Sequence, residues 1–255
     1  MLSTLEHGSI QEWRLNRPPA NALSCEMIIA LREAIEGAAA TGKRALVLSG
    51  APGRFSGGLD VPLLLGYDRV RIATLWREFY GLLQALAISP IPIAAAITGH
   101  APAGGTVLAL FCDYRFMAQG DFKLGLNEVQ VGIPLPPVIL AALRRLVGPR
   151  QAERLGVGGV LLSPEQALAL GLVDELIPAD EVVDRAIRWC QGLLEVPPAA
   201  MNSTRRLARA DLTVCFERDL EAELRQVNAW WWSPETQTTL HGLAARLGKK
   251  PVAAS

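Results

Sequence analysis

Two glycine-containing loops and one carboxylate give this chain the parts needed to stabilise and move negative charge. One loop runs from Phe55 to Asp60 and the other from Gly99 to Gly105, and each follows an apolar run and precedes a helical pattern. Backbone N–H groups at a helix start lack intrahelical partners, so they suit a developing oxyanion. Glu128 follows among apolar residues. Two donor loops and one base predict enolate chemistry.

Each part also has a purely structural interpretation. A glycine pair lets a helix approach a strand, and a Phe-Ser-Gly-Gly loop can be a turn that needs positive φ. Glu128, which follows an asparagine, can cap a turn. Neither loop has the G-x-x-x-x-G-K-[ST] pattern of a phosphate loop or the Rossmann spacing. The presence of both loops, in order with the carboxylate, favours the catalytic interpretation.

The elements that would position these loops are two copies of strand, loop and helix. Continuous apolar runs at Ala45–Leu48 and Ile93–Ile97 predict strands that are buried on both faces. Helical spacing of apolar residues predicts helices from Ser24, as the N-cap, to about Ala40 and from about Arg69 to Ala87. Ile10–Leu15 alternates as an edge strand does. The fold class is therefore α/β.

The second half of the chain is mainly helical after Pro137. Ser163 to Gln166 forms a capping-box pattern with proline at the first helical position. The break at Val196-Pro197-Pro198 predicts a boundary between an α/β core of residues 1–196 and a helical C-terminal segment of residues 197–255, with an interhelix turn as the alternative.

Composition excludes several classes of protein. The chain has 255 residues, half of them hydrophobic, and 25 basic residues balance 25 acidic ones. Without a net charge we expect neither nucleic acid nor an anionic membrane as a partner. Four cysteines without C-x-x-C spacing and three scattered histidines argue against a metal site and predict reduced thiols. With no leader-like or spanning apolar segment, we expect a soluble, cytoplasmic protein.

Three motifs make a family resemblance specific: Ile97 to Gly105, the run Phe111 to Arg115, and Gly125 to Ile133. They resemble the crotonase (enoyl-CoA hydratase/isomerase) superfamily, and within it the mitochondrial-type Δ3,Δ2-enoyl-CoA isomerases, from Asn16 through the helical tail. The resemblance implies a spiral of ββα units, with residues 197–255 used in trimer assembly. It also implies a homotrimer, with a hexamer left open, and an acyl-CoA thioester substrate with no separate cofactor.

The resemblance assigns roles to individual residues. The N–H groups of Leu59 and Gly104 would hold the thioester oxygen, and Glu128 would be the base, with Leu126, Val129 and Val131 predicting a dry pocket and a raised pKa. Hydratases of this family use two glutamates, and Val107 occupies the first of those positions. A valine there would remove a water ligand and add a dry wall. A single base suits a double-bond shift. A hydratase-like or other crotonase acyl-CoA enzyme and a non-catalytic acyl-CoA-binding subunit remain as alternatives.

Further residues are placed around the substrate by the same resemblance. Arg54 is the candidate for a CoA phosphate, and the other predicted substrate-binding residues are Ala20, Ser56, Gly57, Gly58, Asp60 and Gly105. Asp60 can equally complement a helix dipole. His100 is given no catalytic role, and Asp113 and Arg115 are assigned to structural pairing. The aromatic and basic residues left open between a substrate role and a structural one are Trp76, Phe79, Tyr80, Trp230 to Trp232, Lys249 and Lys250.

Overall fold

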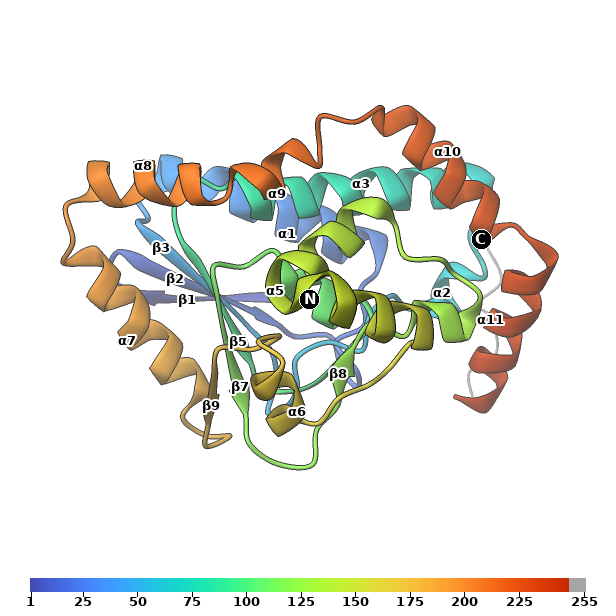
Figure 1. Cartoon of the computed structure of the whole chain (residues 1–255), viewed down its shortest axis with the longest axis horizontal. Helices are drawn as coiled ribbons and strands as arrows, with labels where there is room; N and C mark the ends of the chain where they lie inside the picture. The colour runs from blue at the N-terminus through green and yellow to red at the C-terminus, as the bar shows by residue number, and fades with distance from the viewer. Residues whose placement is uncertain (248–255) are drawn as a thin grey trace.

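The computed structural model describes residues 1–247, and a six-stranded sheet lies at its centre (Figure 1). The strand order is β1-β2-β3-β5-β7-β9, with β1 and β2 antiparallel and every other pair parallel. The strands are β1 (Leu2–His7), β2 (Ile10–Leu15), β3 (Ala45–Ser49), β5 (Ile93–Ile97), β7 (Tyr114–Ala118) and β9 (Glu175–Ile177).

A second, three-stranded parallel sheet stands at the carboxyl ends of this one. It has the order β4-β6-β8 and consists of β4 (Gly53–Arg54), β6 (Gly99–Pro102) and β8 (Leu124–Gly125). β4 follows β3 in the chain, and β6 follows β5 after a single residue. Repetition of strand, short strand and helix gives the spiral of ββα units expected of the family.

Helices cover both faces of the large sheet. On one face lie α1 (Cys25–Ala38) and α3 (Arg69–Ile88), and on the other lies α7 (Val182–Leu194) (Figure 1). The remaining helices are α2 (Val61–Leu64), α4 (Gly104–Leu110), α5 (Pro137–Gly158), α6 (Pro164–Ala169), α8 (Pro198–Ala208), α9 (Ala210–Val214), α10 (Leu220–Trp231) and α11 (Pro234–Arg246), with 3-10 turns at Ala39–Thr41 and Glu128–Val131.

The side chains of β3 show why an uninterrupted apolar run forms this central strand. Leu46 and Leu48 join the core beneath α1 and α3, whereas Ala45 and Val47 join a second core beneath α7. Successive side chains of a strand point to opposite faces, so a strand covered on both faces needs apolar residues at every position. All five residues of β3 are buried.

A buried charge cluster holds the C-terminal helices on the core. Asp113 accepts hydrogen bonds from Arg205 at 2.7 and 2.8 Å, and Arg209 lies 3.1 Å from the same carboxylate. Arg209 also donates to the carbonyl of Phe111 at 2.7 Å. Arg115 pairs with Asp174 at 2.7 Å. These pairs confirm the structural assignment of Asp113 and Arg115. Helices α8 to α10 lie along the outer side of α1 and α3 (Figure 1).

One expectation from the sequence is changed by the structure. Ile10–Leu15 is not an edge strand, because β1 pairs with it on one side and β3 on the other. The break at Val196–Pro198 falls between α7 and α8. Beyond it, α9, α10 and α11 contribute buried residues to the main core, whereas α8 contributes none. Lys249, Lys250 and the rest of the predicted C-terminal segment after Leu247 lie outside the described residues.

Over residues 1–247, no helix combines the length and the apolar character that crossing a bilayer requires. All four cysteines are free thiols.

Candidate active site

The small sheet gathers the three segments that the sequence marks for chemistry. β4 leads into the loop with Leu59, β6 leads into Gly104, and β8 leads into Glu128. The three strands are parallel and hydrogen-bonded, so these segments leave the sheet at the same edge. Ligands of open α/β sheets bind at this carboxyl edge.

Hydrogen bonds around Leu59 occupy its neighbours and leave its own N–H free. Leu23 donates to the carbonyl of Gly58 at 2.7 Å, and Asp60 donates to the carbonyl of Leu23 at 3.0 Å. The N–H of Gly58 donates to Ser56 Oγ at 3.2 Å. Within residues 1–247, the N–H of Leu59 has no hydrogen-bond partner. It is therefore available to an acceptor in the adjacent cavity.

Asn21 fixes the loop of residues 55–60 through hydrogen bonds, a role that the sequence did not predict. Its Nδ2 donates to the carbonyls of Arg54 and Phe55, both at 3.2 Å, and its Oδ1 accepts from the N–H of Arg17 at 2.9 Å. Ser56 Oγ donates to the carbonyl of Asn21 at 2.8 Å. Asn21 is buried and has φ 49°, a conformation that asparagine tolerates better than most residues. The position of Asn21 within the Asn16–Leu23 motif was the one sequence feature that could have indicated this role.

The second free N–H belongs to Gly104, the first residue of α4. The preceding Ala103 has φ 48° and ψ −120°, a conformation that costs a residue with a Cβ about 1–3 kcal/mol. A Cβ placed on Gly104 would lie 3.1 Å from Gly58 Cα and 3.5 Å from Gly58 C, the atom bonded to the nitrogen of Leu59. A side chain at Gly104 would therefore press on the peptide group that carries the Leu59 N–H, so glycine at this position lets the two loops lie close together.

Glu128 begins the 3-10 turn that follows β8. Its Oε2 is buried without a hydrogen-bond partner in the described part of the chain. Burial raises the pKa of Glu128 to about 7, and the residue's own backbone N–H, which hydrogen-bonds the carboxylate, opposes this rise in part. A carboxyl group with a pKa near neutrality can both take up and release a proton. The apolar neighbourhood of Glu128 thus has the effect that the sequence predicts.

One cavity of about 470 Å³ brings Leu59, Gly104 and Glu128 together. Its remaining described wall is mostly apolar and includes Val131, Ile133, Ile139, Trp76, Phe79, Trp231, Leu243 and Leu247. Trp76 and Trp231 meet edge to face with ring centroids 6.0 Å apart. Trp76 and Phe79 therefore belong to the cavity wall, and so does one of the three consecutive tryptophans. The sequence did not predict the contribution of Leu243 in α11 or of Leu247, which follows this helix.

The predicted substrate-binding residues divide into two groups. Ala20, Arg54, Gly57 and Asp60 line the cavity, and the exposed side chain of Arg54 lies where the cavity meets solvent. Ser56, Gly58 and Gly105 lie behind the wall. A Cβ on Gly105 would come within 2.5 Å of the carbonyl oxygen of Ser56, so Gly105 permits close packing of the two loops.

Asp60 is held in structural interactions. Its Oδ2 lies 2.6 Å from a guanidinium nitrogen of Arg17, and its Oδ1 accepts from the N–H of Leu63 at 3.3 Å as the cap of α2. The structural interpretation of Asp60 therefore has direct support.

Val107 and His100 lie away from the cavity wall. Val107 is buried in the main core, so the dry wall expected at this position comes from other side chains. Nδ1 of His100 accepts from the N–H of Lys123 at 3.1 Å, and its ring meets Phe122 edge to face.

No group of three or more His, Cys, Asp or Glu side chains among the described residues is arranged to hold a metal ion.

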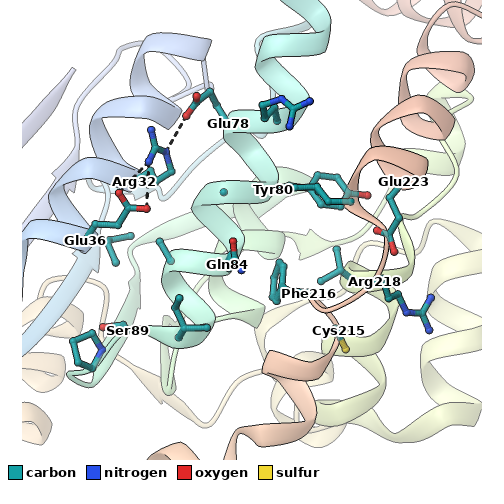
Figure 2. Close-up of a pocket in the computed structure, with 18 residues that line it drawn as sticks. Arg32, Glu36, Glu78, Tyr80, Gln84, Ser89, Cys215, Phe216, Arg218 and Glu223 are labelled. Atoms are coloured by element: carbon teal, nitrogen blue, oxygen red, sulfur yellow. Dashed lines mark hydrogen bonds and ion pairs between the residues drawn. The ribbon is translucent and has the colours of Figure 1, made fainter.

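A second cavity of about 520 Å³ lies between α1, α3 and residues 215–223 (Figure 2). On one side of it Arg32 binds Glu78 at 2.8 Å and Glu36 at 3.0 Å. Tyr80 lines this cavity and not the first one, and burial raises the pKa of its hydroxyl well above the usual value. None of the residues that the sequence marks as an oxyanion donor or base lines it.

Comparisons with known proteins agree with this architecture. Residues 6–249 match the family model described as enoyl-CoA hydratase/isomerase. The chain is 32% identical to mouse mitochondrial enoyl-CoA delta isomerase 1 over 98% of its length and 88% of that protein. It is 35% identical to a probable enoyl-CoA hydratase of Mycobacterium avium, over 80% of this chain and 77% of the relative.

Solved structures show the same likeness. Human mitochondrial Δ3-Δ2-enoyl-CoA isomerase superposes with a TM-score of 0.91 at 28% identity, covering 97% of this chain and 98% of that one. An enoyl-CoA hydratase from Bacillus halodurans superposes with a TM-score of 0.85 at 25% identity, covering 94% and 99%. The chain belongs to the enoyl-CoA hydratase/isomerase family, with the crotonase fold.

Proposed function

We propose that the protein is an enoyl-CoA isomerase that converts a 3-enoyl-CoA into the 2-trans-enoyl-CoA. The observation that carries the proposal is the single cavity in which two unpaired backbone N–H groups and one unpaired carboxyl oxygen occur together. The similarity to the mouse and human proteins named as isomerases supports the same choice.

In the proposed reaction, Glu128 removes a proton from C2 of the substrate. The electron pair of the C–H bond moves into the thioester, and the resulting dienolate oxygen accepts hydrogen bonds from the N–H groups of Leu59 and Gly104. Glu128 then returns the proton to C4, so the enzyme ends in its starting state. An oxyanion donor of this kind contributes about 2.7–4 kcal/mol, and a positioned base about 10²- to 10⁴-fold in rate.

The ion pair of Asp60 supports a double-bond shift over hydration. Addition of water in this family uses two carboxylates, and the second carboxylate in the described cavity wall is already paired with Arg17. The hydratase alternative is favoured by the 35% identity to the relative named as a probable hydratase and by the likeness to the solved hydratase of Bacillus halodurans. A double-bond shift needs one base only.

The experiment that tests the proposal is a parallel assay of purified protein with 3-enoyl-CoA and 2-enoyl-CoA substrates. We expect turnover of the 3-enoyl thioester to give the conjugated product, with hydration of the 2-enoyl thioester much slower. Faster hydration would support the hydratase alternative. Tight binding of both thioesters without turnover would support a non-catalytic acyl-CoA-binding subunit.

The pH dependence of the reaction follows from the environment of Glu128. A base must be ionised in the free enzyme, and the pKa of Glu128 is about 7. We therefore expect kcat/KM to rise with pH through about 7 and then to level off, as one proton leaves the enzyme. A profile that is already level from about pH 5 upward would contradict a buried Glu128 as the base.

The substrate is proposed to bind with its CoA phosphates near Arg54 and its acyl chain against Trp76, Phe79 and Trp231. The homotrimer and the cytoplasmic location remain predictions.

A further inference from the structure

The turn that carries Glu128 is held at two points. It spans Glu128–Val131 and is closed by the N–H of Ile133, which donates to the carbonyl of Glu128 at 3.1 Å. The first contact is with the end of α5, where Gln130 Nε2 donates to the carbonyl of Gly159 at 2.9 Å. The second comes from the C-terminal helix α11 and acts on Gly132, the residue at which the turn ends.

At this second point a chain of hydroxyl groups connects α11 to the turn. Ser233 Oγ donates to Thr236 Oγ1 at 2.9 Å, and Thr236 Oγ1 donates to the carbonyl of Gly132 at 2.5 Å. Thr236 is 1% exposed, so water cannot replace its hydroxyl without rearrangement. The Thr236 hydroxyl is therefore the link that ties Gly132 to the start of α11.

Close packing reinforces this hydrogen bond. Gly132 has φ +76°, and a Cβ placed on it would lie 3.0 Å from Thr236 Cα and 3.2 Å from Thr236 Oγ1. Only glycine allows both the backbone conformation and the approach of the helix. The start of α11 thus sits directly against the end of the turn.

The same helix also forms part of the cavity wall. Leu243 of α11 lines the cavity, and Gln237 Nε2 donates to the carbonyl of Trp231 at 2.7 Å. α11 is therefore joined both to the segment that carries the carboxyl group and to Trp231 of the cavity wall.

We infer that Thr236 is a positioning residue, which through Gly132 fixes the carboxyl group of Glu128 relative to the acyl carbons. This inference rests on the proposed function. It gives the C-terminal segment a part in catalysis besides the assembly role that the family resemblance implies. Proton transfer requires the base within hydrogen-bond reach of the reacting carbon's proton, and a displacement of about 1 Å can cost on the order of 100-fold in rate.

The test compares Thr236→Val, which keeps the shape and removes the hydroxyl, with Thr236→Ser, which keeps the hydroxyl. For Thr236→Val we expect kcat on 3-enoyl-CoA to fall by about 10- to 100-fold while KM stays within about twofold. For Thr236→Ser we expect kcat within about threefold of the wild type. A residue that merely stabilised the fold would not give this split between kcat and KM, nor the rescue.

Thr238→Val is the matched control. Thr238 is exposed on the same helix, and its hydroxyl donates to the carbonyl of Pro234 at 2.8 Å, away from the turn. It should keep wild-type kcat. The inference is overturned if kcat of Thr236→Val stays within about twofold of the wild type, or if Thr236→Val and Thr238→Val lose activity equally.

Thermal unfolding of each variant accompanies the kinetics. If Thr236→Val unfolds below the assay temperature, Thr236→Ala and Thr236→Ser are compared, and equal kcat values for these two overturn the inference. Failure of the proposed function has a different signature, because the wild type itself would then not convert 3-enoyl-CoA. The same variants would in that case be compared on hydration of 2-enoyl-CoA, where loss of kcat in Thr236→Val alone would still support positioning of Glu128.

Discussion

Glu128→Gln is expected to lower kcat on 3-enoyl-CoA by about 10²- to 10⁴-fold, with KM close to that of the wild type. The amide has nearly the same shape as the carboxyl group, but it cannot take a proton from C2. Because the substitution leaves the proposed donors Leu59 and Gly104 in place, substrate affinity should persist. Steady-state kinetics of conjugated thioester formation measures both parameters, and retention of most of the turnover would remove Glu128 from the mechanism.

A stability measurement separates this loss from misfolding. The pKa of Glu128 is about 7 in the folded protein and 4.5 is its ordinary value, so the unfolded chain binds fewer protons between these two pH values. The wild type therefore loses stability as the pH rises from 4.5 to about 7, whereas glutamine carries no such penalty. The Tm of Glu128→Gln should exceed that of the wild type at about pH 8, and the two should agree at about pH 4. A lower Tm for the variant at about pH 8 would contradict the buried, unpaired state of this carboxyl group.

Gly58→Ala is expected to lower kcat/KM by about 10²- to 10³-fold, the loss that follows from disabling one oxyanion donor. The new Cβ would lie 3.1 Å from the nitrogen of Gly104 and 3.1 Å from Ala103 Cβ. One of the two loops must then move, which would displace the proposed donors Leu59 and Gly104 relative to each other. Steady-state kinetics and the affinity for a CoA thioester measure the effect.

Gly42→Ala is the control for backbone strain. Gly42 has φ +82°, close to the φ +80° of Gly58, but a Cβ at Gly42 has open space around it. Both variants should lose about 1 kcal/mol of stability, because alanine is strained at positive φ. Only Gly58→Ala should lose activity. Equal activity of the two variants would show that the contact between Gly58 and Gly104 does not matter for turnover.

The large elements of the fold could be predicted from the sequence because their signals are local. The apolar run at Ile93–Ile97 has the bounds of β5, and the helical spacing from Arg69 ends one residue short of the end of α3 at Ile88. The capping box at Ser163 forms with both of its hydrogen bonds. In each case the local sequence pattern favours the same structure that the tertiary contacts require, so the prediction from the pattern holds.

The small sheet could not be predicted in this way. β4 and β8 have two residues each, and β6 spans Gly99–Pro102, which contains a glycine and a proline. Such segments have no periodicity and low strand propensity. They are strands only because segments far apart in the chain pair with one another, and a single sequence does not display that pairing. β1 was missed for a related reason, since its residues are only half-buried or exposed.

The residues of the candidate site that lie within sequence motifs could be predicted. Those that reach the site only through tertiary packing could not. Leu59, Gly104 and Glu128 lie within motifs, and the structure brings all three to one cavity. Thr236 and Leu243 lie on a helix whose apolar positions could have faced a neighbouring subunit equally well. Thr236 reaches Gly132 across 104 positions of the chain. Val107 lies within a motif and was expected to line the site. The structure places its side chain in the main core instead, because the motif does not determine which way a side chain points.

The ladder β4-β6-β8 also limits how such a site can change. Side chains alternate from one face of a strand to the other, so slippage of one strand by a single residue would reverse every side chain on it. The pairing of the three strands therefore fixes where the segments that carry Leu59, Gly104 and Glu128 leave the sheet. New chemistry on this scaffold would then come from exchanging side chains near the strand ends, with the pairing of the strands unchanged.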